Sequence, residues 1–227
     1  MKHFTRITAL LTALLCAAQV KAQNFPVSRF AVGASVGTGH TWVRNNPFSP
    51  ISINGESNMN PAYKPSWSAG VSTAFHATQH FGIGLDLLYS LEGDRVEKGP
   101  IAVQIDIQYV RVPLRFFYYF GHSSNSFRPQ ASLGATAGWK TGQHCFITAS
   151  DRHIADVDAS NAYNSFDYGL NASFGFNQKI SDRIAVNADL VYYHGVSDIM
   201  RGDHSVFDNQ STLNSNLGLQ IRVLYGL

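Results

Sequence analysis

The C-terminal stretch Asn216-Leu-Gly-Leu-Gln-Ile-Arg-Val-Leu-Tyr-Gly-Leu227 decides the fold, because its residues alternate in character to the last position. Every second residue from Leu217 onward is large and apolar, and the residues between them are small or polar, apart from Leu224. Side chains of a β-strand point alternately to the two faces of its sheet. The stretch therefore predicts a strand with one apolar face and one mostly small, polar face.

Seven earlier segments alternate in the same way and are bounded by turn residues. The fourth contains two irregularities: its apolar phase changes between Tyr109 and Val110, and Pro113 lacks an amide donor. We expect a β-bulge at the phase change and a local gap in the ladder at the proline. The seven segments cover residues 29–42, 66–77, 81–91, 104–120, 127–140, 166–177 and 183–194.

The connections between these segments alternate in length. Short turns fall near residues 78–79, 121–126 and 179–182, and long connections span residues 43–65, 92–103, 141–164 and 195–211. Short periplasmic turns and longer outer loops are typical of outer-membrane barrels. The sequence thus predicts an all-β fold, an eight-stranded antiparallel up-and-down transmembrane β-barrel with its apolar face toward lipid.

Aromatic residues on the apolar face fall into two groups by height. Phe30 and Trp42 are twelve residues apart, as are Phe127 and Trp139. On tilted strands this spacing is about 30 Å, close to the hydrocarbon thickness of a bilayer. We interpret the groups as two membrane-interface girdles. Their members are Trp42, Trp67, Tyr89, Trp139 and Tyr192 at the long-loop end, and Phe30, Phe75, Phe81, Phe120, Phe127, Phe176 and Tyr225 at the short-turn end.

Composition and the N-terminal residues agree with an envelope protein. Charged residues make up 14% of the chain, below the proportion in an average soluble domain, and a net charge of +2 gives no reason to expect nucleic-acid binding. Lys2 and Arg6 precede an apolar run from Ile7 to Val20, which is typical of a secretory signal peptide. We predict a signal peptide over residues 1–22, cleaved near Ala22, and a single barrel domain over residues 23–227.

The polar face of the segments carries both acids and bases. Unpaired charges inside a narrow barrel are costly, so their near balance favours a structural network of ion pairs that fills the lumen. A pore lined by fixed charges is an alternative, although eight strands leave little room for an open channel. A soluble lipocalin-like barrel, with these residues in water, is another. The predicted network comprises Asp86, Asp106, Arg111, Arg115, Arg128, Lys140, Asp167, Asp189 and Arg222.

Three stretches resemble a known family. Tyr109-Val-Arg-Val-Pro-Leu-Arg-Phe-Phe-Tyr-Tyr-Phe120 is similar to a strand of the PorT-like outer-membrane β-barrel proteins, and Phe127 to Gly134 and Phe166 to Leu170 are similar to later strands. The resemblance extends over the predicted mature chain. It implies an eight-stranded outer-membrane barrel, and, because the family is functionally mixed, it implies no single activity. The member that gives the family its name acts in secretion across the envelope.

The sequence favours a structural or interaction module in the outer membrane over an enzyme. Function on a rigid scaffold tends to reside in loops, so we expect partners at the long loops: lipid and surface glycolipid, and a protein. We expect a monomer without cofactor, metal site or catalytic residues. The alternatives are an accessory component of a protein-secretion system, a small passive pore, and a lipid-modifying enzyme that would use His76 or His194.

Overall fold

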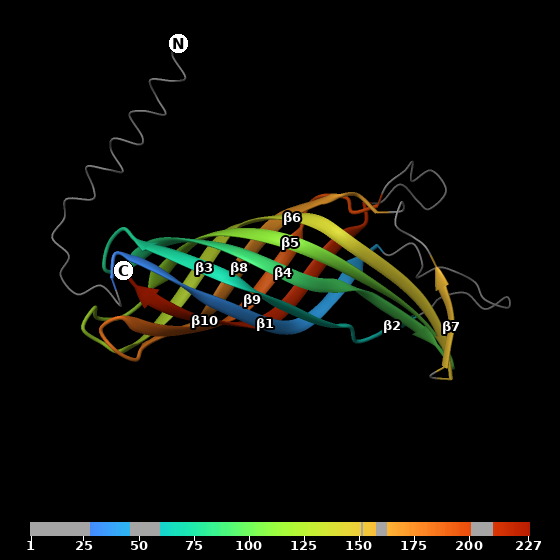
Figure 1. The fold of residues 1–227 in the computed structure, drawn as a ribbon, viewed down its shortest axis with the longest axis horizontal. Coiled ribbons are helices and arrows are strands. Elements are labelled where there is room, and N and C mark those ends of the chain that lie inside the picture. The colour runs from blue at the N-terminus through green and yellow to red at the C-terminus, as the bar shows by residue number, and fades with distance from the viewer. Residues whose placement is uncertain (1–27, 46–59, 151, 158–162, 201–210) are drawn as a thin grey trace, which may run out of the picture.

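The computed structural model describes residues 28–45, 60–150, 152–157, 163–200 and 211–227. The predicted signal peptide and its cleavage position lie outside these residues. Eight long strands form a closed antiparallel ring in the order β3, β1, β10, β9, β8, β6, β5, β4, and β4 returns to β3 (Figure 1). The predicted eight-stranded barrel is therefore confirmed. The strands of the ring are β1 (Phe30–Arg44), β3 (Pro65–His76), β4 (Phe81–Lys98), β5 (Ile101–Tyr119), β6 (Phe127–Ala149), β8 (Phe166–Lys179), β9 (Ile184–Gly195) and β10 (Leu213–Gly226).

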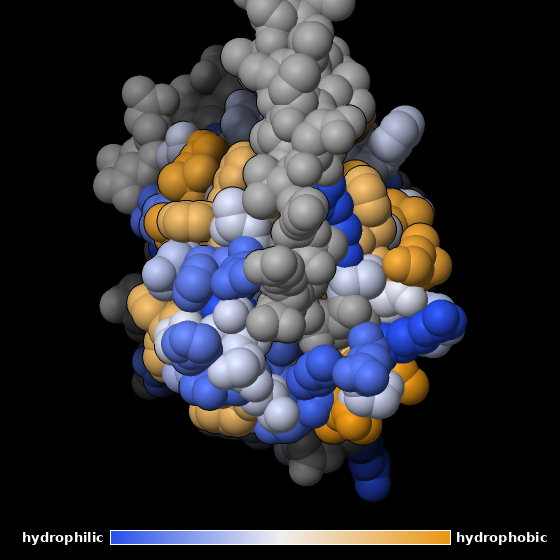
Figure 2. Space-filling view, turned by 90° about the vertical axis from the view of Figure 1, so that its left-hand side faces the viewer, coloured by the Kyte–Doolittle hydropathy of each residue, from blue (hydrophilic) through white to orange (hydrophobic). Residues whose placement is uncertain are grey.

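Alternation places the apolar face outside. In β10 the side chains of Leu219 and Ile221 are exposed, whereas Arg222 and Leu224 are each 2% exposed. The C-terminus lies at the end of the barrel where short turns join β3 to β4 and β8 to β9 (Figure 1). Seen from this end, hydrophilic residues cover the end face and hydrophobic residues appear toward its sides (Figure 2). Within the described ranges no helix is long and apolar enough to span a bilayer.

The bulge predicted between Tyr109 and Val110 lies one residue earlier in the β5–β6 register, and its extra residue belongs to the neighbouring strand β6. The β5–β6 register shifts between Gln108 and Tyr109, where Thr141 is the extra residue of β6. The alternation of β5 therefore continues unbroken, and Ile105 and Ile107 face the lumen together with Tyr109, contrary to the predicted phase change. The gap expected at Pro113 is present, because the β4–β5 pairing is interrupted opposite it.

Two of the predicted long loops contain strand residues that extend the barrel strands. β4 and β5 continue to Lys98 and Ile101 as a hairpin, and β6 continues to Ala149, where β7 (Arg152–Val157) pairs with it. We call this extension the projecting sheet; it extends beyond the rest of the barrel in Figure 1. The two-residue strand β2 (Asn60–Pro61) pairs with β4. The projecting sheet therefore continues the strands beyond the girdle residues of the long-loop end.

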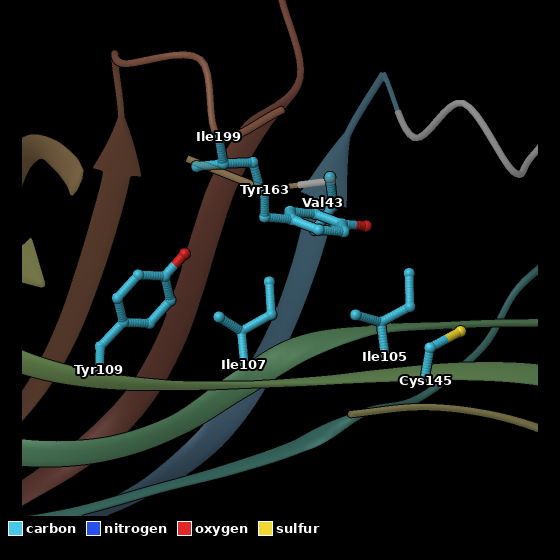
Figure 3. Packing of buried hydrophobic residues seen from close by; sticks show 7 residues of the cluster. All are labelled: Val43, Ile105, Ile107, Tyr109, Cys145, Tyr163 and Ile199. Carbon is cyan, nitrogen blue, oxygen red and sulfur yellow. The ribbon is translucent and has the colours of Figure 1, made fainter. Parts of the chain in front are cut away.

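Apolar residues pack inside the barrel at both ends. At the long-loop end, side chains of β5 face residues from the segments that follow β7 and β9 (Figure 3). This mouth cluster contains Val43, Ile105, Ile107, Tyr109, Cys145, Tyr163 and Ile199, all at most 8% exposed. At the short-turn end, the base cluster contains Ala31, Ala74, Phe117, Tyr119 and Leu224. The polar part of the lumen thus lies between two apolar layers.

Candidate functional site

A network of four charged side chains crosses the lower half of the lumen. Arg115 donates to both oxygens of Asp86, at 2.9 and 3.1 Å, and Arg222 donates to Asp86 at 3.2 Å. Arg222 also reaches Asp189 at 2.6 Å, and Gln130 Nε2 donates to the other oxygen of Asp189 at 2.6 Å. This base-side network has two positive and two negative charges, all at least 95% buried. It joins strands from opposite sides of the ring.

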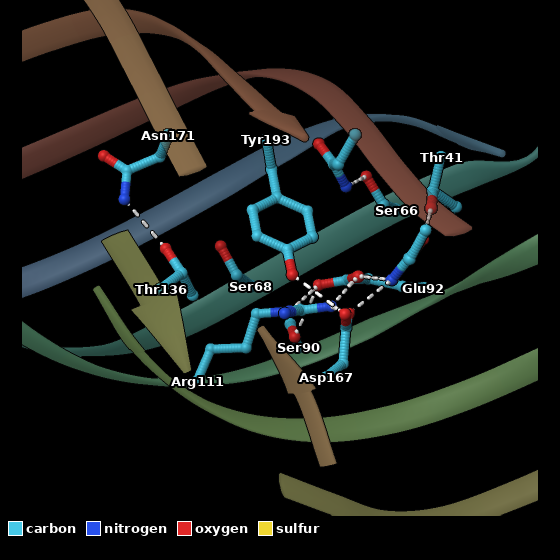
Figure 4. Close-up of polar contacts among 12 residues, drawn as sticks. Thr41, Ser66, Ser68, Ser90, Glu92, Arg111, Thr136, Asp167, Asn171 and Tyr193 are labelled. Atoms are coloured by element: carbon cyan, nitrogen blue, oxygen red, sulfur yellow. Dashed lines mark hydrogen bonds and ion pairs between the residues drawn. The ribbon is translucent and has the colours of Figure 1, made fainter. Parts of the chain in front are cut away.

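A second network lies nearer the mouth and centres on Arg111. Its guanidinium binds Glu92 at 2.5 and 2.6 Å and Asp167 at 2.7 Å. Tyr193 donates its hydroxyl to Asp167 at 3.0 Å (Figure 4). The amide of Asn214 bridges the two acids at 2.7 and 3.3 Å. We call this the mouth-side network. Every carboxylate oxygen of Glu92 and Asp167 accepts at least one hydrogen bond, so the network leaves neither buried acid with an unsatisfied acceptor.

Three residues of the predicted network are placed differently. Arg128 faces the lumen but donates to backbone carbonyls, including that of Gln79 at 2.7 Å. Lys140 donates to the backbone carbonyl of Tyr163 at 2.7 Å and so anchors this residue of the mouth cluster to β6. Asp106 alternates with the buried Ile105 and Ile107 along β5, and its printed ion pair is with neither of the two networks.

Asp106 instead pairs with Lys64, a residue that the sequence did not single out. The Nζ–Oδ1 distance is 2.6 Å, and the lysine side chain is 3% exposed. Sequence reasoning also missed Glu92 and Asn214, which belong to the mouth-side network. Glu92 fell just beyond the end of the predicted third segment, and continuing that segment's alternation from Asp86 would have placed it in the lumen. For Lys64, in a predicted loop, no sequence signal was available.

The predicted girdle residues lie on the outer face. Ring pairs join neighbouring strands in both groups, with centroid distances of 5.6 Å for Trp67 and Tyr89 and 4.8 Å for Phe30 and Phe75. Trp42 and Phe75 are half-buried. The others are exposed: Trp67, Tyr89, Trp139 and Tyr192 toward the long loops, and Phe30, Phe81, Phe120, Phe127, Phe176 and Tyr225 toward the short turns.

The two histidines weighed for catalysis make structural contacts. The ring nitrogens of His194 are occupied by the hydroxyl of Tyr192 at 3.0 Å and the guanidinium of Arg44 at 3.2 Å. His76 contacts the hydroxyl of Tyr119 at 3.4 Å, beside the base cluster. Among the described residues, no three His, Cys, Asp or Glu side chains are grouped so as to hold a metal ion.

Comparison with known proteins agrees with this architecture. A family model described as an outer membrane protein beta-barrel domain matches residues 18–201. The outer membrane protein OprG from Pseudomonas aeruginosa is 14% identical, with a TM-score of 0.50 over 88% of this chain and 96% of that one. Neisserial surface protein A is 12% identical, with a TM-score of 0.45 over 86% and 97%. The likeness to OprG supports the fold alone, and no curated protein matches the chain.

Proposed function

The chain belongs to the outer membrane protein β-barrel domain family and resides in the outer membrane, and we propose that it acts there as a closed structural and interaction module. The proposal has two parts. The lumen is filled by side chains and conducts no solutes, and the contacts with partners are made by the part of the barrel outside the membrane.

The observation that carries the first part is the layered filling of the lumen. From base to mouth the interior passes through the base cluster, the base-side network, the mouth-side network and the mouth cluster. Ile107 and Tyr119, at most 1% exposed, lie in the two apolar layers. Hydrated ions would have to cross both layers, and transfer of a charge into an apolar layer is strongly unfavourable. A passive pore is therefore the weaker candidate.

The second part is supported by the projecting sheet. Its strands hold the same β-pairing as the barrel wall, so it offers a rigid surface outside the lipid, and rigid surfaces lose little entropy on binding. A protein partner there would fit an accessory role in secretion, the alternative that the PorT-like resemblance allows. Arg44 and Arg95 lie at this end, where they can meet phosphate or carboxylate groups of surface glycolipid.

We propose that the protein is not an enzyme. A hydrolytic histidine must be able to take a proton from its nucleophile. Both nitrogens of His194 already have partners, and one of these is the cationic Arg44. Replacement of His194 by Gln should leave the lipid profile of the cell unchanged.

Conductance in planar lipid bilayers tests the closed lumen. We expect the purified wild-type barrel to insert without steady current. A double variant that removes one side chain from each apolar layer, Ile107→Gly with Phe117→Gly, should conduct, and Leu133→Gly with Leu190→Gly on the outer face is the matched control. Steady wild-type current would refute the proposal.

A photo-crosslinking residue tests the interaction surface in intact cells. Placed at Arg95 on the projecting sheet, it should capture protein or glycolipid, whereas the same residue at Ser124 in a short turn should not give those adducts. Equal adducts from both positions would contradict the second part.

A further inference from the structure

An arginine is held against the outer wall at the long-loop end. Arg44 shares the lipid-facing side of β1 with Trp42 and lies two residues beyond it toward the mouth, near headgroup height. Its Nε atom donates to Ser215 Oγ at 2.9 Å, and its Nη2 atom donates to the backbone carbonyl of Gly195 at 2.6 Å. Its Nη1 atom contacts His194 Nε2 at 3.2 Å. These contacts fix the guanidinium and use three of the five N–H groups of an arginine.

Arg44 has no acidic partner in the described part of the chain. The arginines of the two lumen networks bind carboxylates, whereas none of the ion pairs among the described residues includes Arg44. Its side chain is half-buried, and one N–H group on each Nη atom is left for a further acceptor. A cation beside lipid is unfavourable without an anion, and paired N–H groups suit the oxygens of a phosphate.

Tyr192 supplies a second donor, through His194. An arginine N–H can only donate, so His194 Nε2 accepts from Arg44 and the neutral ring carries its proton on Nδ1. Nδ1 therefore donates to the hydroxyl of Tyr192 at 3.0 Å, and that hydroxyl keeps its own proton for another acceptor. Arg44 and Tyr192 thus both offer donors on the outer wall.

A groove on the outer wall begins at Tyr192. It has a volume of about 420 Å³ and lies over β6, β8, β9 and β10. Ala172 is paired with Leu133 on one side and with Tyr192 on the other, so a small side chain leaves a hollow between two large ones. Leu133 is six residues from both Phe127 and Trp139, so the groove reaches the middle of the membrane. The large side chains around the hollow are Leu133, Phe174, Leu190, Tyr192 and Leu217.

The donors and the groove follow one another in the order of the parts of a lipid. Arg44 lies at headgroup height, Tyr192 belongs to the girdle, and the groove extends into the hydrocarbon, where an acyl chain fills it. The long-loop end faces the outside, so this lipid belongs to the outer leaflet. We infer that the outer wall binds one phosphorylated glycolipid, with its phosphate at Arg44 and one acyl chain over Ala172. This inference names the glycolipid contact of the proposed function and rests on it.

Native mass spectrometry of the refolded full chain, titrated in detergent with diphosphoryl lipid A, tests the headgroup contact. We expect one molecule to bind saturably. Arg44→Gln should weaken binding about tenfold, the effect of one hydrogen bond to a charged group. Arg183→Gln is the matched control and should bind like the wild type, because Arg183 also contacts a tyrosine, Tyr225 at 3.1 Å, but in the other girdle. Equal binding by the two variants, or no saturable binding, would overturn the inference.

Filling the hollow tests the acyl chain. Ala172→Leu should weaken binding of lipid A about tenfold, because the added carbons displace about two methylenes of the chain. Ala135→Leu is the control, since Ala135 is exposed on β6 and does not line the groove. Band shift on unboiled gels shows that each variant is folded. Equal affinities of the two variants would contradict the placement of the chain.

Two further lipids identify the headgroup. Dephosphorylated lipid A and phosphatidylglycerol should each bind at least tenfold more weakly than diphosphoryl lipid A. Equal binding of the dephosphorylated form would remove the role of the phosphate, and equal binding of phosphatidylglycerol would overturn the assignment to a glycolipid. Protein adducts at Arg95 in intact cells would survive either failure, because Arg95 does not line the groove, so the inference and the proposed function fail separately.

Discussion

Replacement of Asp86 by Asn is the sharpest test of the lumen networks. The change keeps the shape of the side chain but removes the charge that Arg115 and Arg222 share. Arg222 retains Asp189, while Arg115, 4% exposed, loses the one carboxylate within 4 Å among the described residues. Removing one partner of a buried ion pair costs about 3–5 kcal/mol, because the other charge stays buried without compensation.

Asp182→Asn is the matched control. Lys179 and Asp182 form an ion pair of the same length, 2.9 Å, but the aspartate is 98% exposed. Exposed pairs contribute little because water and salt screen them. Unfolding in urea from phospholipid vesicles, followed by tryptophan fluorescence and by band shift on unboiled gels, should show a large loss for D86N and none resolved for D182N. Addition of Arg115→Met to D86N should restore part of the loss. Equal stability of the two single variants would refute the reasoning.

Other substitutions probe the outer face, the lumen and the mouth. Leu133, 68% exposed on the apolar face, should cost about 2–4 kcal/mol when changed to Arg, and Asn125→Arg in a short turn should cost far less in the same urea assay. Gly138→Val should destabilise by about 1–3 kcal/mol, because a Cβ there would be 2.8 Å from Arg111 Nη1; unchanged stability would show that the guanidinium is not held. Cys145 should react with maleimide far more slowly in the folded barrel than in urea, since it is 5% exposed and burial raises the pKa of its thiol. Because the folded state favours the protonated thiol, the free energy of unfolding should fall as the pH rises above the ordinary thiol pKa. Similar maleimide labelling rates in the folded and unfolded states would contradict the buried mouth cluster.

The alternation of residues was enough to predict the ring and its outward face. A strand's side chains alternate whatever its neighbours are, so Leu219 and Arg222 could be assigned to opposite faces from sequence alone. The same rule assigned the wrong face to the apolar residues of β5 beyond the membrane. Ile105 and Ile107 are apolar because they close the mouth from inside, and an apolar row does not reveal which side of the wall it covers. The phase change at Tyr109 therefore marks a change from lipid-facing to lumen-facing apolar residues.

The projecting sheet was missed for a related reason. In the β4 half of the hairpin the acids Glu92 and Asp94 are both buried, at 4% exposed, so the residues from Glu92 to Lys98 show no apolar alternation. The predicted loop boundary at Glu92 then hid the acid that pairs with Arg111. Pairings such as Lys64 with Asp106 depend on how strands far apart in sequence are aligned, and composition carries no record of that alignment.

Quenching of tryptophan fluorescence by brominated phospholipids tests most directly whether the apolar face meets lipid. All three tryptophans of the chain, Trp42, Trp67 and Trp139, belong to the girdle at the long-loop end. In refolded vesicles, bromine near the headgroup should quench their emission more strongly than bromine near the bilayer centre, and aqueous iodide should quench weakly. Strong quenching by iodide with no effect of brominated lipid would contradict the account.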